Sequence, residues 1–203
     1  MKKQTKETVP VWDIAVRVFH WGLVAAFTIA YLTEDDFEIV HVYAGYIVLG
    51  LISFRLIWGL IGTKHARFSD FICRVSRVKQ YLKTVLAGKP KHYLGHNPAG
   101  GMMIVVLLLS LFALSYSGLA TYAAEGKGPL ANTETSLIPS AYADDDHHRS
   151  GKGDLWEDIH ELLANFILLL VFIHLAGVFV SSLVHRENLI RAMVTGKKQS
   201  QPE

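Results

Sequence analysis

Four long runs of apolar residues divide the chain into hydrophobic segments joined by polar ones. The runs cover residues 14–32, 41–61, 102–124 and 159–184. Each has about the 20 residues that a helix needs to cross the roughly 30 Å hydrocarbon layer of a membrane. Backbone polar groups in lipid must be satisfied within their own segment, which favours helices. The pattern predicts an all-α integral membrane protein, with four spans forming one domain over residues 1–203.

The polar segments alternate in charge along the chain. Residues 62–101 hold eight Lys or Arg against one acid, and the tail from 185 holds four against two. Residues 33–40 hold four acids and no base, and residues 125–158 hold eight acids against three bases. Because Lys and Arg are enriched on the cytoplasmic side of membrane proteins, we expect both termini and the second connection in the cytoplasm.

Two segments have patterns of their own. The first run is longer than the apolar part of a secretory signal and contains Arg17 and His20, so it is predicted to be an uncleaved span. In the second connection, apolar residues recur at three- and four-residue intervals from Phe71 to Leu86, with Arg and Lys on the opposite face. This pattern predicts a basic amphipathic helix on the cytoplasmic membrane surface, ended near Gly88.

Composition narrows the possible chemistry. The chain is 51% hydrophobic, and Cys73 is its one cysteine, which excludes an intrachain disulfide, an iron–sulfur cluster and a Cys-rich zinc site. The CxxCH motif of covalently bound haem is absent as well. We identify no nucleophile, acid–base pair or phosphate loop and expect no nucleic-acid partner. Whether the chain is an enzyme in its own right is left open.

Four of the ten histidines lie within the apolar runs or at their ends: His20, His41, His160 and His174. Ionisable side chains at such positions are rare and are candidates for function. His160 and His174 are fourteen residues apart, so about 1400° of helical rotation places them on one face, separated by about 21 Å. Two ligands that far apart on one face indicate two stacked sites.

Depth in the membrane selects a partner for each of these histidines. The first span runs outward with His20 in its inner half, and the second runs inward from His41. The fourth span also runs inward, from His160 at its outer end to His174. His41 therefore pairs with His160, and His20 with His174. Two histidines facing each other across a helix bundle are suited to bis-imidazole haem. We predict two non-covalent haem b groups with these four histidines as iron ligands.

Other assignments remain open for the histidines. His96, in "GHNPAGG" before the third run, could replace His20 at the inner site. His147 and His148 follow three acidic residues and could bind a metal ion, although their spacing is unspecific. A haem-free transporter or proton-relay bundle is a hypothesis of a different class.

Two arginines and three glycines lie at positions where they could serve a bound haem. Arg17 lies one turn from His20, and Arg55 lies fourteen residues after His41, near the inner level. Each could pair with a haem propionate or reach the inner membrane surface. A porphyrin also needs space beside its ligands, which small residues near the histidines provide: Gly22, Gly45 and Gly177.

Several stretches resemble the prokaryotic cytochrome b561 family, and its hydrogenase-type cytochrome b subunits in particular. They are "VPVWDIAVRVFHWGLV", "HVYAGYIVLGLISFRLIWGLIGTKHARFSDF", "GHNPAGGMM" and "DIHELLANFILLLVFIHLAGV", and the resemblance covers nearly the whole chain. It implies a protein of the bacterial inner membrane that binds two haems through the four histidines. Relatives pass electrons between the quinone pool and a redox partner, such as a hydrogenase or a c-type cytochrome.

The acidic residues of the outer connections indicate whether the chain acts with a redox partner protein. One branch of the family is similar to superoxide:quinone oxidoreductases, which act without a partner protein. The outer connections here contain Glu34, Asp35, Asp36 and Asp144–Asp146. Such a field repels an anionic substrate and attracts a basic protein. We therefore expect a periplasmic or membrane redox partner protein, with the standalone oxidoreductase as the alternative.

Overall fold

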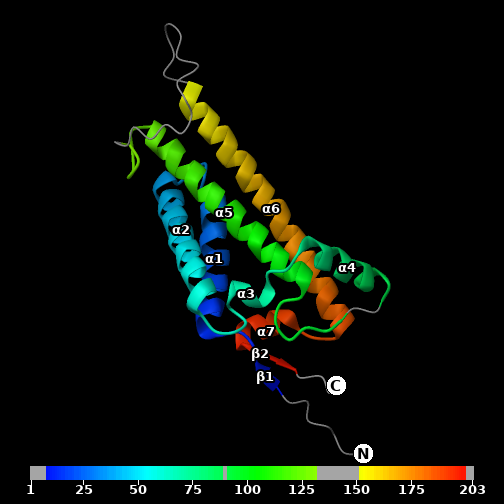
Figure 1. The fold of residues 1–203 in the computed structure, drawn as a ribbon. Coiled ribbons are helices and arrows are strands. Elements are labelled where there is room, and N and C mark those ends of the chain that lie inside the picture. Colours follow the sequence, from blue (N-terminus) through cyan, green and yellow to red (C-terminus); the bar gives the residue numbers. More distant parts are fainter. Residues whose placement is uncertain (1–7, 89–90, 132–150, 200–203) are drawn as a thin grey trace, which may run out of the picture.

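Four long helices form a bundle in the computed structural model, which describes residues 8–88, 91–131 and 151–199 (Figure 1). They are α1 (Ile14–Leu32), α2 (Glu38–Ile61), α5 (Pro98–Ala124) and α6 (Gly151–His185). All four are long and apolar enough to cross a membrane. Helix α1 packs against α2, α2 against α5, and α5 against α6. The predicted all-α four-helix membrane fold is confirmed.

Helix α1 begins where its apolar run does, and the other three long helices begin earlier than theirs. Helix α6 starts at Gly151 instead of 159, and its first turns hold acidic residues, which are favoured near a helix N-terminus. Helix α5 starts at Pro98, whose fixed φ suits the first helical position. Asn97 caps that helix, because its side-chain oxygen accepts a hydrogen bond of 2.8 Å from the Gly100 backbone N–H.

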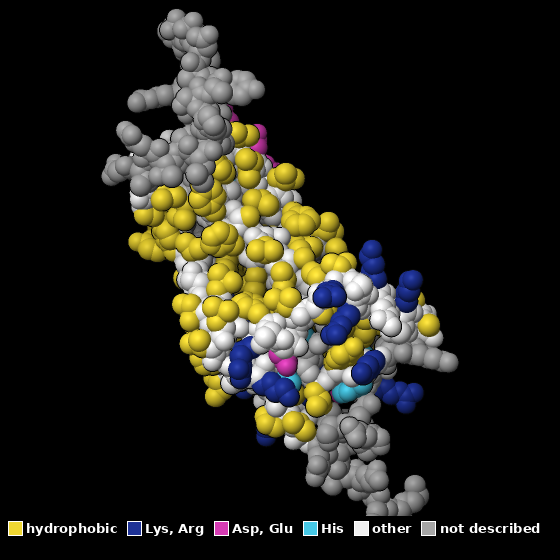
Figure 2. Space-filling view, viewed as in Figure 1, with side chains coloured by type: hydrophobic (Ala, Val, Ile, Leu, Met, Phe, Trp, Pro, Cys, Tyr) yellow, Lys and Arg dark blue, Asp and Glu magenta, His cyan; other side chains and the backbone are white. Residues whose placement is uncertain are grey.

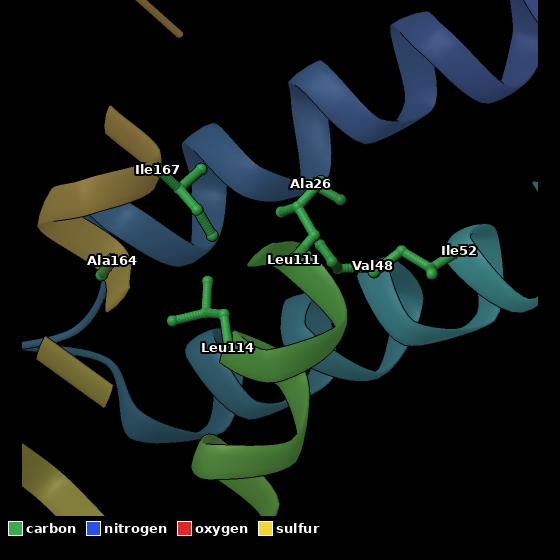
Figure 3. Packing of buried hydrophobic residues seen from close by; sticks show 7 residues of the cluster. All are labelled: Ala26, Val48, Ile52, Leu111, Leu114, Ala164 and Ile167. Carbon is green, nitrogen blue, oxygen red and sulfur yellow. The ribbon is translucent and has the colours of Figure 1, made fainter. Parts of the chain in front are cut away.

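The core of the bundle lies at mid-height, where all four long helices meet (Figure 3). Its most buried side chains are Ile52 on α2 and Ile167 on α6, which are 0% and 1% exposed. Small residues, Ala26 on α1 and Ala164 on α6, let the helix backbones approach. This cluster lies between the half of the bundle that contains His41 and His160, which is the predicted outer half, and the half that contains His20 and His174, which is the predicted inner half.

Most of the helix surface outside the core is apolar and exposed. Figure 2 shows hydrophobic side chains along the length of the bundle, with Lys and Arg gathered toward one end. In water such a surface would be costly, whereas lipid solvates it. The helices therefore have the surface of a membrane-embedded bundle.

The second connection contains two helices where one was predicted. The short helix α3 (Phe68–Phe71) is followed by extended backbone at Ile72 and Arg74, and α4 (Val75–Leu86) then begins. The predicted continuous helix from Phe71 is therefore wrong at its start. The break lets Phe71 turn inward, where it is 4% exposed, while α4 extends along the surface. Gly88, with φ of 69°, follows the end of α4 as expected.

Both described ends of the chain meet at the same end of the bundle (Figure 1). Strand β1 (Thr8–Pro10) pairs antiparallel with β2 (Lys197–Gln199), which follows α7 (Leu189–Thr195). Gly196 makes the turn between α7 and β2 with φ of 78°. A Cβ atom there would lie 2.6 Å from the Trp12 carbonyl oxygen, so only glycine fits.

Asp13 joins the start of α1 to the end of α2. Its Oδ1 accepts a 2.7 Å hydrogen bond from the Val16 N–H, and its Oδ2 accepts bonds from Trp58 Nε1 (3.1 Å) and Thr63 Oγ1 (2.5 Å). Partial burial raises the pKa of Asp13, but hydrogen bonds from Thr63, Val16 and Trp58 outweigh it and lower the pKa overall. The carboxylate thus serves as a helix cap and as a tie between two helices.

We expect Asp13→Ala to lower the free energy of unfolding by about 1–3 kcal/mol, because it removes a cap and leaves two donors unpaired. Thermal unfolding in detergent measures the change. Asp36→Ala, at an exposed position in the turn after α1, is the matched control and should change stability by less than about 0.5 kcal/mol. Equal effects of the two substitutions would contradict this role of Asp13.

Candidate functional site

His41 on α2 and His160 on α6 face each other in the outer half of the bundle. Their ring centroids are 6.0 Å apart, and the ring planes are inclined at 78°. A metal–imidazole nitrogen bond is about 2 Å long, so imidazoles on opposite sides of one metal ion have centroids roughly 6 Å apart. The two rings therefore lie at a separation that suits a single metal atom between them.

Hydrogen bonds hold both rings of this pair in one orientation. His41 Nδ1 donates to the Ala30 carbonyl oxygen at 2.9 Å. His160 Nδ1 donates to the Leu114 carbonyl oxygen at 3.1 Å and lies 3.0 Å from Ser117 Oγ. A carbonyl only accepts, so Nδ1 carries the proton in each ring and Nε2 keeps a free lone pair. This is the usual arrangement of a metal-binding histidine.

An apolar cavity of about 90 Å³ adjoins the outer pair, and all four long helices line it. Its walls include Phe27, Val48, Leu114 and Leu119, with Tyr46 and Tyr122 among the few polar side chains. Gly45 belongs to this wall, and a Cβ atom added to it would meet nothing within 4 Å. A haem is larger than the cavity, so the side chains would move apart on binding. The ligand set and the apolar lining fit a porphyrin.

Two residues of this site, Ser117 and Gly118, were not predicted from the sequence. Ser117 is 1% exposed and lies against His160 Nδ1. A Cβ atom on Gly118 would lie 2.8 Å from Cε1 of the His160 ring, so the glycine makes room for that ring. The stretch "SYSGLAT" in an otherwise Leu-rich span was the available signal.

The inner half of the bundle contains the second predicted pair, His20 on α1 and His174 on α6. His20 and His174 lie near each other, and His96 is near His174 as well. Among the described residues, none forms a hydrogen bond with the buried Nδ1 of His20. A buried ring nitrogen without a partner is costly, which is consistent with a site completed by a bound group.

The ring of His96 packs against the rings of Trp12 and Phe71. The ring centroids are 4.4 Å and 4.8 Å from that of His96. Burial, together with the nearby charges of Arg55 and Lys198, lowers the pKa of His96 to about 3. His96 is therefore neutral at physiological pH, and its buried Nδ1, like that of His20, has no hydrogen-bond partner among the described residues.

The two predicted arginines each have one donor in use and one buried donor left over. Arg55 is 3% exposed, and its Nη2 donates to the Ala66 carbonyl oxygen at 2.9 Å. Arg17 Nη2 donates to the carbonyl oxygen of Val194 in the C-terminal segment. Within the described part of the chain, Arg55 Nη1 and Arg17 Nε have no partner. These unpaired donors fit an anionic group such as a haem propionate.

A site for a free metal ion is not found in the described residues. No group of three or more His, Cys, Asp or Glu side chains is close enough there to hold one. His147, His148 and Asp144–Asp146 lie outside the described residues. The paired histidines are therefore the metal-binding candidates of the described chain.

Comparison with known proteins gives the family of the chain. A family model described as prokaryotic cytochrome b561 matches residues 11–196. The chain is 28% identical to a probable Ni/Fe-hydrogenase B-type cytochrome subunit of Azotobacter vinelandii, with 97% of this chain and 90% of the relative covered. It is 24% identical to a protein of the same description from Rhizobium leguminosarum bv. viciae, with 95% and 90% covered. No solved structure matches. The chain belongs to the prokaryotic cytochrome b561 family and is a membrane-embedded b-type cytochrome, an electron-transfer protein that binds haem b.

Proposed function

We propose that this chain is a di-haem cytochrome of the bacterial inner membrane that passes electrons between the quinone pool and a redox partner protein. The observation that carries the proposal is the outer pair, His41 and His160, whose rings face each other at 6.0 Å. Both rings keep Nε2 free because Nδ1 is hydrogen-bonded. Such preorientation supports their assignment as the two axial ligands of the outer haem.

His20 and His174 are the proposed ligands of the inner haem. His174 lies on the face of α6 that carries His160, about 21 Å along the helix. The unpaired Nδ1 of His20 and the nearness of His20 to His174 support a shared site. Arg55 and Arg17 are the proposed partners of the propionates, because each has a buried donor to spare.

When bound, each haem supplies a one-electron redox centre. The chain determines where these centres lie and what surrounds them. Helix α6 provides one ligand at each level, so its length sets the separation of the two sites. The core around Ile52 and Ile167 excludes water between them. An apolar, water-poor surrounding is one of the means by which a protein tunes a haem potential.

The charge distribution supports an orientation and a kind of partner. The strands β1 and β2 and helix α4 lie at the end of the bundle where Figure 2 shows Lys and Arg, which we assign to the cytoplasm. The opposite end carries Glu34, Asp35 and Asp36 and suits a basic periplasmic surface. Relatives named as Ni/Fe-hydrogenase B-type cytochrome subunits make a hydrogenase the favoured partner over a c-type cytochrome.

We expect Ser117→Ala to weaken haem binding at the outer site roughly tenfold or more, because a group that orients a metal-binding histidine is lost. Haem transfer from the purified protein to an apoprotein acceptor measures the affinity. Ser110→Ala, which removes another buried serine from α5, is the matched control and should leave haem transfer unchanged. Equal rates for both variants would argue against the role of Ser117.

Affinity purification from native membranes under mild detergent tests the partner. Co-purification of a hydrogenase, and haem reduction on addition of hydrogen, would support the proposal. If the chain alone oxidised superoxide with a quinone analogue, the standalone alternative would replace it. If the purified protein contained no haem at all, a transporter or proton-relay role would be favoured instead.

A further inference from the structure

Helix α4 carries a surface that neither the haem sites nor the helix core uses. We propose that this surface binds the headgroups of anionic phospholipids at the inner end of the bundle. Its contact groups are Lys79 and Lys83, beside an apolar line formed by Val75, Leu82 and Leu86. The proposal stands independently of the number of haems and of their ligands.

One side of α4 is fixed to the rest of the protein. Tyr81 is 7% exposed and meets the Tyr93 ring edge-on, with centroids 5.8 Å apart. Val78 and Val85 flank it and are half-buried. Burial raises the pKa of the Tyr81 hydroxyl, as expected for a packed phenol. This side packs toward α5 and determines which residues of α4 point away.

A line of apolar side chains points away from the protein. Val75, Leu82 and Leu86 are 59%, 47% and 88% exposed. At 100° per residue they lie within about 40° of one another around the helix, so they form one line along it. Leucines this exposed are costly in water and stable in the acyl region of a membrane.

Two lysines lie directly beside that line. Lys79 and Lys83 are one turn apart and lie about 20–60° around the helix from Leu86. Both are exposed, and neither forms an ion pair with any described residue. A lysine next to an apolar line can extend its stem along the acyl chains and keep its ammonium at headgroup level. Two ammonium groups one turn apart suit the phosphate of an anionic lipid.

The position of α4 favours lipid over a protein partner. Figure 1 shows α4 projecting sideways from the bundle beside the lower part of α6, and Figure 2 shows Lys and Arg side chains gathered there. Exposed apolar faces of the membrane spans lie directly above this level. An apolar line below a lipid-covered surface, edged by cations, matches the boundary between acyl chains and headgroups.

The single cysteine offers a local reporter for the test. Cys73 is half-buried, lies two residues before α4 and can carry a fluorophore on the full-length holoprotein in nanodiscs. Nitroxide-labelled phosphatidylglycerol or phosphatidylcholine is added at trace levels to a fixed lipid mixture. Each labelled lipid quenches the fluorophore to an extent that depends on how often that lipid lies beside it. We expect phosphatidylglycerol, the anionic lipid, to quench the fluorophore more than phosphatidylcholine does. Each lysine should raise the ratio of the two lipids beside the fluorophore by on the order of fivefold.

Substitutions distinguish specific binding from general attraction. Lys79→Gln with Lys83→Gln should abolish most of the preference, and 0.5 M salt should weaken it. Arg77→Gln is the matched control: Arg77 lies about 160° and 120° around the helix from the two lysines and should matter little. Haem absorption verifies that each variant is folded. Equal quenching by both lipids, an unchanged preference in the double variant, or a probe shielded from both lipids by protein would overturn the proposal.

Discussion

Replacing His160 by alanine should leave a protein that binds one haem instead of two. His160 supplies one of the two proposed ligands of the outer site, and His41 alone would hold the haem from one side only. The His160 ring is held in place by two hydrogen bonds before any metal binds. Its loss removes one bond to the iron and a ligand that needed no reorientation to form that bond. A pyridine haemochrome assay on the purified variant should give about half the haem per chain.

The control for this variant lies on the same helix. His185 ends α6 beyond both proposed haem levels, so His185→Ala should keep the full haem content. Added imidazole should enter the space left by His160→Ala and restore some outer haem. If His160→Ala kept both haems with unchanged spectra, the assignment of the outer ligands would be wrong.

Replacing His20 by alanine should remove the inner haem and spare the outer one. His20 and His174 are the proposed inner ligands because they lie at the same predicted depth in the membrane, on α1 and α6. Midpoint potentials from a redox titration should change from two components to one. The component that remains should be the same one that His160→Ala removes.

His96 is the alternative to His20 as a ligand of the inner haem, and substitutions at the two positions can be compared directly. Its ring packs against those of Trp12 and Phe71, so phenylalanine preserves that packing while removing the nitrogens. His96→Phe should therefore keep both haems. If it lost the inner haem while His20→Ala kept it, the two histidines would have to exchange roles.

The membrane spans and the closeness of His41 to His160 could be predicted because both depend on local pattern and depth. Twenty apolar residues define a span, and loop charges define its direction, so His41 and His160 were expected at one level. The structure brings these two together. Helix α4 could also be predicted from local pattern, because its apolar residues recur every three to four positions.

Contacts that depend on how helices rotate against each other could not be predicted. Helix α5 is apolar all round, so nothing in its sequence indicates that Ser117 and Gly118 face His160. Arg17 was placed near His20 correctly along the helix, yet its bond to Val194 depends on the C-terminal segment returning beneath the bundle. Likewise, the break before α4 follows from the burial of Phe71, which is a tertiary effect.

Haem stoichiometry combined with low-temperature electron paramagnetic resonance of the oxidised, purified protein tests the central proposal most directly. We predict two haem b per chain, both low-spin with signals of bis-histidine ligation, and one signal lost in each of His160→Ala and His174→Ala. One haem per chain, a high-spin signal from an intact site, or the loss of both signals in one well-folded variant would contradict two separate sites on a shared helix.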